Sequence, residues 1–263
     1  MTVLRLLLLA GLGYGALAAM VWLYAEQVLF QPPAPSYSGS MVPFTPVPVG
    51  QRDTLAVQYL PNPGAHYTIL HSHGNAEDLG FLQPVFQELR AAGFAVIGYD
   101  YRGYGRSTNR RPTVRRAIED AVAVYHYAVR ELGIPPDRII LHGRSLGSGP
   151  TLELATRYDA AAVILESAFV SVVRVVTRIK VFPFDHFSNL DRIRKVSRPV
   201  LVIHGTRDAV IPTWHGRRLY DAAPGPKEAL WVEGAGHNDL AMIAGAEHGQ
   251  ALARFAAGIS EGP

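Results

Sequence analysis

Apolar residues form two kinds of run along the chain. Short and almost continuous apolar runs alternate with longer stretches in which apolar residues recur at helical spacing. The short runs predict strands at Leu55–Leu60, Tyr67–His71, Ala95–Tyr101, Ile139–His142, Ala162–Leu165, Val200–His204 and Ala229–Glu233. The longer stretches predict helices over Phe81–Ala92, Thr113–Leu132 and Leu240–Ala257, with further helices between most of the strands. Continuous apolar strands are buried on both faces, so the pattern predicts an α/β fold with a mostly parallel central sheet flanked by helices.

The N-terminal stretch Leu6–Ala25 is a run of twenty uncharged, mostly apolar residues, long enough to cross a bilayer. Trp22 and Tyr24 stand where interfacial aromatic residues are enriched. A cleaved signal peptide is the alternative, because residues 16–18 have the small-x-small form that signal peptidase accepts, and cleavage there would give a secreted protein. The apolar run continues past that point, so we favour an uncleaved, single-pass membrane anchor. Positive charge only at Arg5 predicts that the rest of the chain lies on the non-cytoplasmic side.

Prolines at 32, 33, 35, 43, 46 and 48 predict an extended tether that merges into an edge strand. The expected organisation is therefore a membrane segment over residues 1–30, a proline-rich tether with the first edge strand over 31–50, and a catalytic domain over 51–263. At 263 residues with 48% hydrophobic content, the chain as a whole can bury a full core.

Composition narrows the classes of function. The formal net charge is only +3, and no basic run is dense enough to track a phosphate backbone, so we expect no nucleic-acid partner. The chain has no cysteine, which excludes disulfides, thiolate catalysis and cysteine-based metal sites.

A G-x-S-x-G sequence spans Gly143–Gly147, between a predicted strand and a helical stretch. In a nucleophile elbow, the serine sits on a strained strand-to-helix turn and its hydroxyl projects from the sheet. This context favours Ser145 as a nucleophile over an ordinary turn serine. It also places the Leu146 backbone N–H at a helix N-terminus, where it can stabilise an oxyanion.

The partners of such a serine are expected at the carboxyl ends of other strands. Asp208 follows the strand at Val200–His204, and His237 follows the strand at Ala229–Glu233, so the order is Ser, Asp, His. An imidazole titrates near pH 6.5 and suits removal of the serine proton, so activity should rise through about pH 6 to 7. Asp208 would fix the tautomer of His237 and stabilise the imidazolium. Glu166 and His248 are less well placed rivals.

The loop His73-Gly74-Asn75 follows another strand and is the expected source of a second oxyanion donor, the backbone N–H of Asn75. The pair His71 and His73 also has the form of a zinc site, but no further ligand cluster stands at a recognisable spacing, so we expect no metal and no cofactor. We interpret Gly103-Tyr104-Gly105 as a structural turn rather than a dinucleotide loop, because the third glycine and the acidic partner are absent.

The segment between the strands ending near Leu165 and beginning near Val200 is rich in Val and Phe and too short for a large lid. Two interpretations stay open: part of it lines a groove for an acyl chain near the membrane, or it is a small helix packed on the core.

Five motifs together resemble one family. They are H-G-N-A-E-D-L-G from His73, Y-D-Y-R-G-Y-G from Tyr99, G-R-S-L-G-S-G from Gly143, F-P-F-D from Phe182 and G-A-G-H-N-D-L from Gly234. They are similar to the small membrane-associated serine hydrolases of the α/β-hydrolase fold, which include eukaryotic depalmitoylases and many bacterial relatives. The resemblance runs from about Phe44 to Phe255 and aligns the family's Ser, Asp and His with Ser145, Asp208 and His237. This chain lacks the acylated cysteine cluster of the depalmitoylases and has an apolar helix instead.

The sequence thus predicts a serine hydrolase that cleaves carboxylic ester or thioester bonds of acyl substrates through an acyl-enzyme, with lipid-like substrates among the candidates. Two other functions are alternatives: a catalytically silent binding protein of the same fold, and an acyltransferase that uses the same acyl-enzyme.

Overall fold

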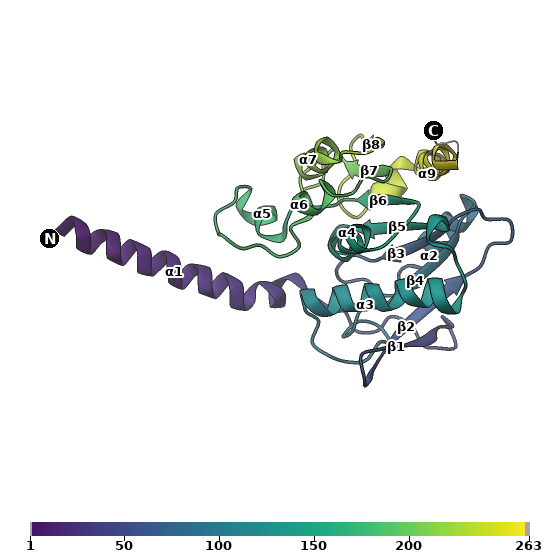
Figure 1. The fold of residues 1–263 in the computed structure, drawn as a ribbon, viewed down its shortest axis with the longest axis horizontal. Coiled ribbons are helices and arrows are strands. Elements are labelled where there is room, and N and C mark those ends of the chain that lie inside the picture. The colour runs from purple at the N-terminus through teal and green to yellow at the C-terminus, as the bar shows by residue number, and fades with distance from the viewer. Residues whose placement is uncertain (1, 261–263) are drawn as a thin grey trace.

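The computed structural model describes residues 2–260 and confirms the α/β fold predicted from the apolar pattern (Figure 1). The sheet has eight strands in the order β1-β2-β4-β3-β5-β6-β7-β8. β1 and β2 are antiparallel to each other and β2 is antiparallel to β4, whereas all remaining pairs are parallel. The strands are β1 (Thr45–Val49), β2 (Asp53–Leu60), β3 (Thr68–Ser72), β4 (Ala95–Tyr99), β5 (Ile139–Arg144), β6 (Ala162–Glu166), β7 (Val200–Gly205) and β8 (Lys227–Val232).

Helices cover both faces of this sheet. The helices of the body are α2 (Gln83–Ala91), α3 (Val114–His126), α4 (Ser148–Arg157), α6 (Asn189–Ile193), α7 (Trp214–Ala222), α8 (Leu240–Ala244) and α9 (Ala246–Ser260). α2 and α9 pack over one face, and α3 and α4 over the other. Successive residues of a strand serve the two faces: Ile69 belongs to the core under α2, and Leu70 to the core under α3.

Two predicted helices end differently from expectation. The helix expected over Thr113–Leu132 begins with Thr113, whose side chain accepts a hydrogen bond from the Arg116 backbone N–H at 3.1 Å. It finishes in one turn of π-helix, Tyr127–Glu131. The helix expected over Leu240–Ala257 is two helices, α8 and α9, because Gly245 adopts a positive φ of 54° that interrupts the helical hydrogen bonding.

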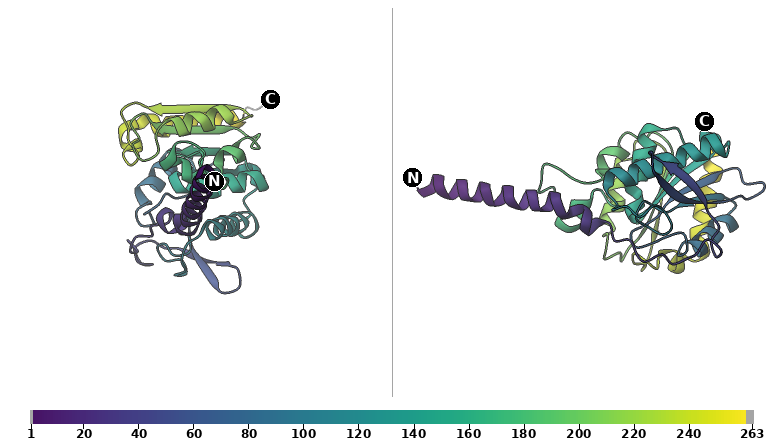
Figure 2. Two further views of the ribbon diagram at one scale, coloured as in Figure 1. Left: turned by 90° about the vertical axis from the view of Figure 1, so that its left-hand side faces the viewer. Right: turned by 90° about the horizontal axis from the view of Figure 1, so that it is seen from below.

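The N-terminal apolar stretch is a single helix, α1 (Thr2–Leu29), and it is long and apolar enough to cross a membrane. α1 extends away from the body of the molecule (Figure 1), and the end-on view in Figure 2 shows it leaving from the middle of one side. The next side chain, Phe30, is buried in the core beneath α3. The proline-rich segment that follows is packed on the domain, where the Tyr37 hydroxyl donates to Asp100 Oδ2 at 2.5 Å.

A short cap segment, residues 171–188, lies between β6 and α6 and contains the helix α5 (Val172–Thr177). It lies on the same side of the molecule as α1 (Figure 1). The Tyr14 hydroxyl of α1 donates to the Val181 carbonyl of the cap at 2.9 Å. The cap and α1, distant in sequence, are therefore neighbours in space.

Candidate active site

Ser145 lies directly after β5 on a sharp turn into α4. Its φ is +51°, a left-handed conformation that side chains rarely adopt. The turn is tight because glycines permit close approach: a Cβ on Gly147 would lie 1.9 Å from the Ser72 carbonyl oxygen, and one on Gly143 would lie 2.7 Å from the Gly147 carbonyl oxygen. This is the local geometry of a nucleophile elbow.

Ser145, His237 and Asp208 form one hydrogen-bonded chain. His237 Nε2 lies 3.0 Å from Ser145 Oγ, and His237 Nδ1 lies 2.7 Å from Asp208 Oδ2. The three residues stand after β5, β7 and β8, so the parallel sheet brings together groups that are 29 and 92 positions apart from His237. The arrangement has the contacts that a serine, a general base and an orienting carboxylate require.

The Asp208 carboxylate is fixed from several directions. Its Oδ1 accepts hydrogen bonds from the backbone N–H groups of Val210 at 2.9 Å and Ile211 at 2.7 Å. Burial opposes its ionisation, but the hydrogen bonds from His204 and His237 outweigh burial and hold the pKa of Asp208 well below its usual range. Asp208 is therefore an anion that keeps one orientation toward His237.

The two predicted oxyanion donors border the same space as Ser145. Asn75 and Leu146 line one cavity together with Ser145. The Asn75 side-chain oxygen is held by two donors, because Oδ1 accepts from the Gln31 N–H at 2.8 Å and the Tyr104 hydroxyl at 2.7 Å. These bonds hold the loop of Asn75 in place, and the role of its backbone N–H as an oxyanion donor stays a prediction from the sequence.

Arg144 joins the loops on either side of Ser145, a role that the sequence did not indicate. Its guanidinium donates to the His237 carbonyl at 2.9 Å and forms an ion pair with Glu77. Glu77 in turn accepts a hydrogen bond from the Gly74 N–H at 2.7 Å. One side chain thus links the loop of His237 with the loop of Asn75.

The two rival candidates contact each other instead of Ser145. His248 Nε2 lies 3.1 Å from Glu166 Oε2, and both side chains are buried. Burial alone would raise the pKa of Glu166, but the contacts with His142 and His248 hold it well below its usual range. For His248, burial lowers the pKa but the bond to Glu166 raises it further, so the net shift is upward. The pair connects β6 to α9 below the elbow.

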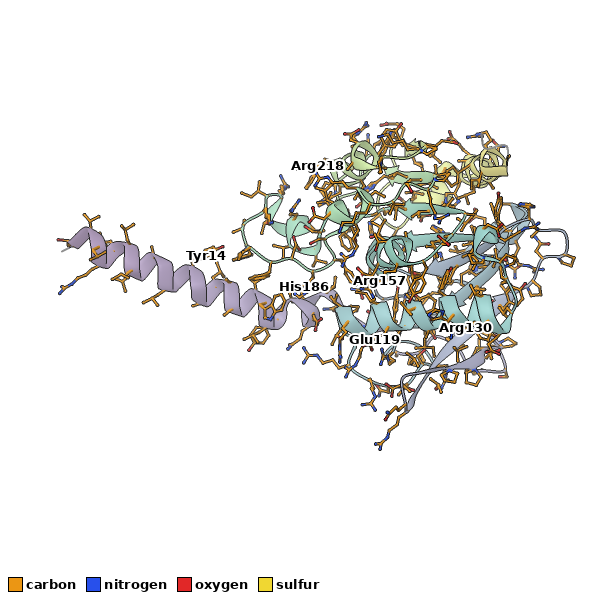
Figure 3. All side chains as sticks on the ribbon, in the orientation of Figure 1. Tyr14, Glu119, Arg130, Arg157, His186 and Arg218 are labelled. Carbon is orange, nitrogen blue, oxygen red and sulfur yellow. The ribbon has the colours of Figure 1, made fainter. Side chains whose placement is uncertain are left out.

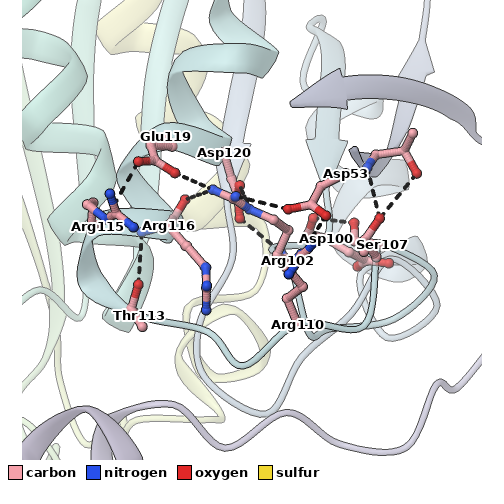
Figure 4. A network of polar contacts seen from close by, with 12 residues as sticks. Asp53, Asp100, Arg102, Ser107, Arg110, Thr113, Arg115, Arg116, Glu119 and Asp120 are labelled. Carbon is pink, nitrogen blue, oxygen red and sulfur yellow. Dashed lines mark hydrogen bonds and ion pairs between the residues drawn. The ribbon is translucent and has the colours of Figure 1, made fainter. Parts of the chain in front are cut away.

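The turn at Gly103-Tyr104-Gly105 is structural, as expected. The buried Arg102 beside it donates to Asp120 Oδ1 at 2.6 Å and to Glu119 Oε2 at 2.7 Å, and contacts Asp53 Oδ2 at 3.3 Å (Figure 4). Both glycines have positive φ. The network fixes the loop that carries Tyr104, and thereby helps to hold Asn75.

The predicted histidine pair is divided between two partners. His71 Nδ1 lies 3.1 Å from His142 Nδ1, whereas His73 Nδ1 donates to the Gly74 carbonyl at 2.7 Å. Burial, followed by the nearby His142, lowers the pKa of His71 well below the usual range. Within residues 2–260, no group of three or more His, Asp or Glu side chains is arranged to hold a metal ion.

The cavity beside Ser145 has a volume of about 690 Å³ and is almost wholly apolar in its lining; we call it the Ser145 cavity. Pockets for small molecules typically measure roughly 300–1,000 Å³. One wall comes from the cap and the loop after β6, including Val173, Phe182 and Phe169, and a facing wall comes from α1. The structure thus favours the groove interpretation of the cap, although Phe184 lies against Trp22 rather than in the cavity lining.

A second cavity of about 500 Å³ lies between α1 and α3 and differs in character. Charged and polar side chains surround it, including Glu119, Arg157 and His186, which are labelled in Figure 3. It does not include Ser145, so the polar cavity and the Ser145 cavity lie against different parts of α1.

Comparisons with known proteins show the family to which the chain belongs. The family model of the S33 serine aminopeptidases matches residues 64–188. Human α/β-hydrolase domain-containing protein 17B is 41% identical over 203 residues, which cover 76% of this chain and 68% of the human protein. Protein 17C of Xenopus tropicalis is 45% identical over 187 residues, covering 70% of this chain and only 60% of that relative.

Solved structures share the fold. An esterase of Pyrococcus furiosus superposes with a TM-score of 0.71 at 19% identity, covering 86% of this chain and 97% of the esterase. A monoacylglycerol lipase of Paleococcus ferrophilus gives a TM-score of 0.61 at 21% identity, covering 79% of this chain and 99% of the lipase. The chain belongs to the α/β-hydrolase family, in the depalmitoylase-like group of the domain-containing 17 proteins, which confirms the resemblance found in its motifs.

Proposed function

We propose that this α/β-hydrolase cleaves the carboxylic ester or thioester bond of an acyl substrate through a covalent acyl-enzyme. The observation that carries the proposal is the continuous chain from Ser145 Oγ through His237 to Asp208, with distances of 3.0 and 2.7 Å. Ser145 attacks the acyl carbon while His237 takes its proton, and Asp208 stabilises the imidazolium that forms. His237 then protonates the leaving alcohol or thiol, and a water molecule attacks the acyl-enzyme with His237 again as the base.

The negative oxygen of each tetrahedral intermediate needs donors close to Ser145. We assign this role to the backbone N–H groups of Leu146 and Asn75, which border the same cavity. Leu146 lies at the start of the helical turn after the elbow, where the partial positive charge of a helix N-terminus adds to the hydrogen bond. No step requires a cofactor.

We also propose that α1 anchors the protein in a membrane as a single span, with the catalytic domain over residues 51–263 on the non-cytoplasmic side. The length and composition of α1 support the anchor. The position of Arg5 supports the orientation. Retention of α1 is checked by sequencing the N-terminus of the mature protein, and a soluble chain that begins at Ala19 would contradict the anchor.

The test is hydrolysis of p-nitrophenyl esters by the full chain in detergent, compared with Ser145→Ala. We expect turnover that Ser145→Ala abolishes, together with an acyl adduct on Ser145 detected by mass spectrometry after rapid quenching. Turnover that survives Ser145→Ala would contradict the assignment of the nucleophile. Absence of turnover with every ester would favour a binding protein, and faster ester consumption on addition of an alcohol or amine acceptor would favour an acyltransferase.

A further inference from the structure

The last turns of α1 form one wall of the Ser145 cavity. The α1 side chains that line it are Met20, Val21, Tyr24, Ala25, Val28 and Leu29. These residues form two rows with a spacing of four, which is the pattern of a single helix face. A helix that served only as a tether would not need to present one face to the reacting serine.

Contacts at several positions along α1 fix the position of this wall. The Gln31 N–H after the helix donates to Asn75 Oδ1 at 2.8 Å, and Glu26 Oε1 accepts from the Val114 N–H at 2.8 Å. Higher on the helix, the Trp22 ring stacks on His186 with ring centroids 5.0 Å apart. The helix is thus attached both to the oxyanion loop and to the cap.

The facing wall is also mainly apolar, and Ser145 and Asn75 are among the few polar residues that line the cavity. Phe182 of the cap is only 5% exposed and stacks on Tyr14 of α1, with centroids 5.8 Å apart. An aliphatic chain gains free energy by entering such a space, whereas a polar group loses its hydration there. The shape and chemistry therefore fit an amphiphile whose ester or thioester bond lies at Ser145 and whose chain extends along α1.

The outer side of this wall is open. Met20 is 52% exposed and Val28 is 72% exposed, although both border the cavity. Met20 belongs to the apolar stretch Leu6–Ala25, so in a helix that crosses a membrane it contacts lipid tails rather than water, whereas Val28 lies beyond the interfacial residues Trp22 and Tyr24. The cavity then opens toward the bilayer along α1.

We infer that the C-terminal half of α1 is a specificity-determining wall of the acyl site. The acyl chain of the substrate enters sideways along α1 and lies between α1 and the cap. The inference rests on the proposed hydrolysis at Ser145 and adds the residues that select the acyl chain.

The first test fills the cavity from the α1 side. Ala25→Trp in the full chain places an indole in the acyl path, and Leu23→Trp is the matched control because Leu23 is 65% exposed and is not part of the cavity lining. Each methylene buried in the groove should favour binding about fourfold. We therefore expect Ala25→Trp to lower kcat/KM for the palmitoyl ester by about tenfold or more and to change that for the acetyl ester by less than about twofold.

The outcomes separate the two proposals. An unchanged palmitoyl-to-acetyl ratio in Ala25→Trp, or an equal loss on both esters, would overturn the role of α1 while leaving Ser145-dependent hydrolysis intact. A wild-type chain without Ser145-dependent turnover on any ester would overturn both proposals. A similar change of the ratio in Leu23→Trp would also overturn the role of α1, because that side chain does not border the cavity.

A second test does not depend on turnover. Since the chain has no cysteine, Ala25→Cys and Leu23→Cys each introduce a single thiol. A hexadecyl fluorophosphonate bound covalently to Ser145 should protect the thiol at position 25 from a lipophilic maleimide, whereas an ethyl fluorophosphonate should not. The thiol at position 23 should react equally with either phosphonate in place. Equal reactivity at position 25 after both phosphonates would overturn the inference.

Discussion

The two sides of Ser145 are formed by different kinds of side chain. On one side lie charged and hydrogen-bonded groups: His237, Asp208, Arg144, and the Glu166–His248 pair below them. On the other side lies the Ser145 cavity, with walls of aliphatic and aromatic side chains from α1 and the cap. Charged groups in a buried setting hold one geometry because every misalignment leaves a charge unpaired. Apolar walls do not fix the orientation of a bound group in this way. They select an acyl chain by the apolar area that it buries and the volume that it fills. The polar side should therefore govern the rate of the chemistry, and the apolar side the choice of acyl chain.

The largest expected effect comes from the polar side. Asp208→Asn keeps the shape of the side chain but removes the anion that orients His237. We expect kcat to fall by about 10⁴-fold, on all acyl lengths alike. Because the pKa of Asp208 is held below its usual range, the group is ionised throughout pH 5 to 9, and a large loss should therefore be found at each pH in that range. Steady-state kinetics against pH would check this, and a loss confined to long-chain esters would contradict it.

A smaller effect on the same side is expected from Arg144→Met, which removes the link between the loops of His237 and Asn75. We expect kcat to fall by about 10- to 100-fold with KM nearly unchanged, because the displaced groups act in the chemical step rather than in binding the chain. Arg144→Lys should recover part of the loss, since a single ammonium can replace one of the contacts. A rise of KM with constant kcat would indicate a role in substrate binding instead.

The smallest effect concerns stability at the Glu166–His248 pair. The lowered pKa of Glu166 contributes stability above its unfolded pKa near 4.3, and this is lost as pH falls. The raised pKa of His248 contributes stability below its unfolded pKa near 6.5, and this is lost as pH rises through the folded value. Glu166→Gln should therefore lower the free energy of unfolding most between about pH 4.5 and 6.5, by about 2 kcal/mol, and by less at pH 9. Thermal melts of both proteins across this range give the comparison; an equal cost at pH 5.5 and 9 would contradict the coupling.

Sequence reasoning found the polar side more readily than the apolar one, for a physical reason. Continuous apolar runs predict the strands. The residues that follow parallel strands lie at one edge of the sheet, so Ser145, Asp208 and His237 could be proposed together. The elbow follows from Gly143 and Gly147, because only glycine permits the close approach that the turn requires.

Other features depend on contacts that no local pattern encodes. Val28 and Phe182 line the same cavity although they are about 150 residues apart in the chain. No spacing along the sequence indicates that they are neighbours. Arg144 links the loops after β3 and β8, and the pair of Glu166 with His248 joins β6 to α9, so both contacts appear only in the assembled fold. The break at Gly245 was missed because a lone glycine is tolerated within many helices.

The most direct test of the division between the two sides is the ratio of kcat/KM for palmitoyl and acetyl esters in two variants of the full chain. Asp208→Asn should lower both values by nearly the same factor and leave the ratio within about twofold of wild type. Phe182→Ser, on the cap wall, should lower the ratio by about tenfold or more, because the apolar contact with the distal chain is lost and a hydroxyl is introduced. A Phe182→Ser enzyme with the wild-type ratio, or an Asp208→Asn enzyme with an altered one, would contradict the account.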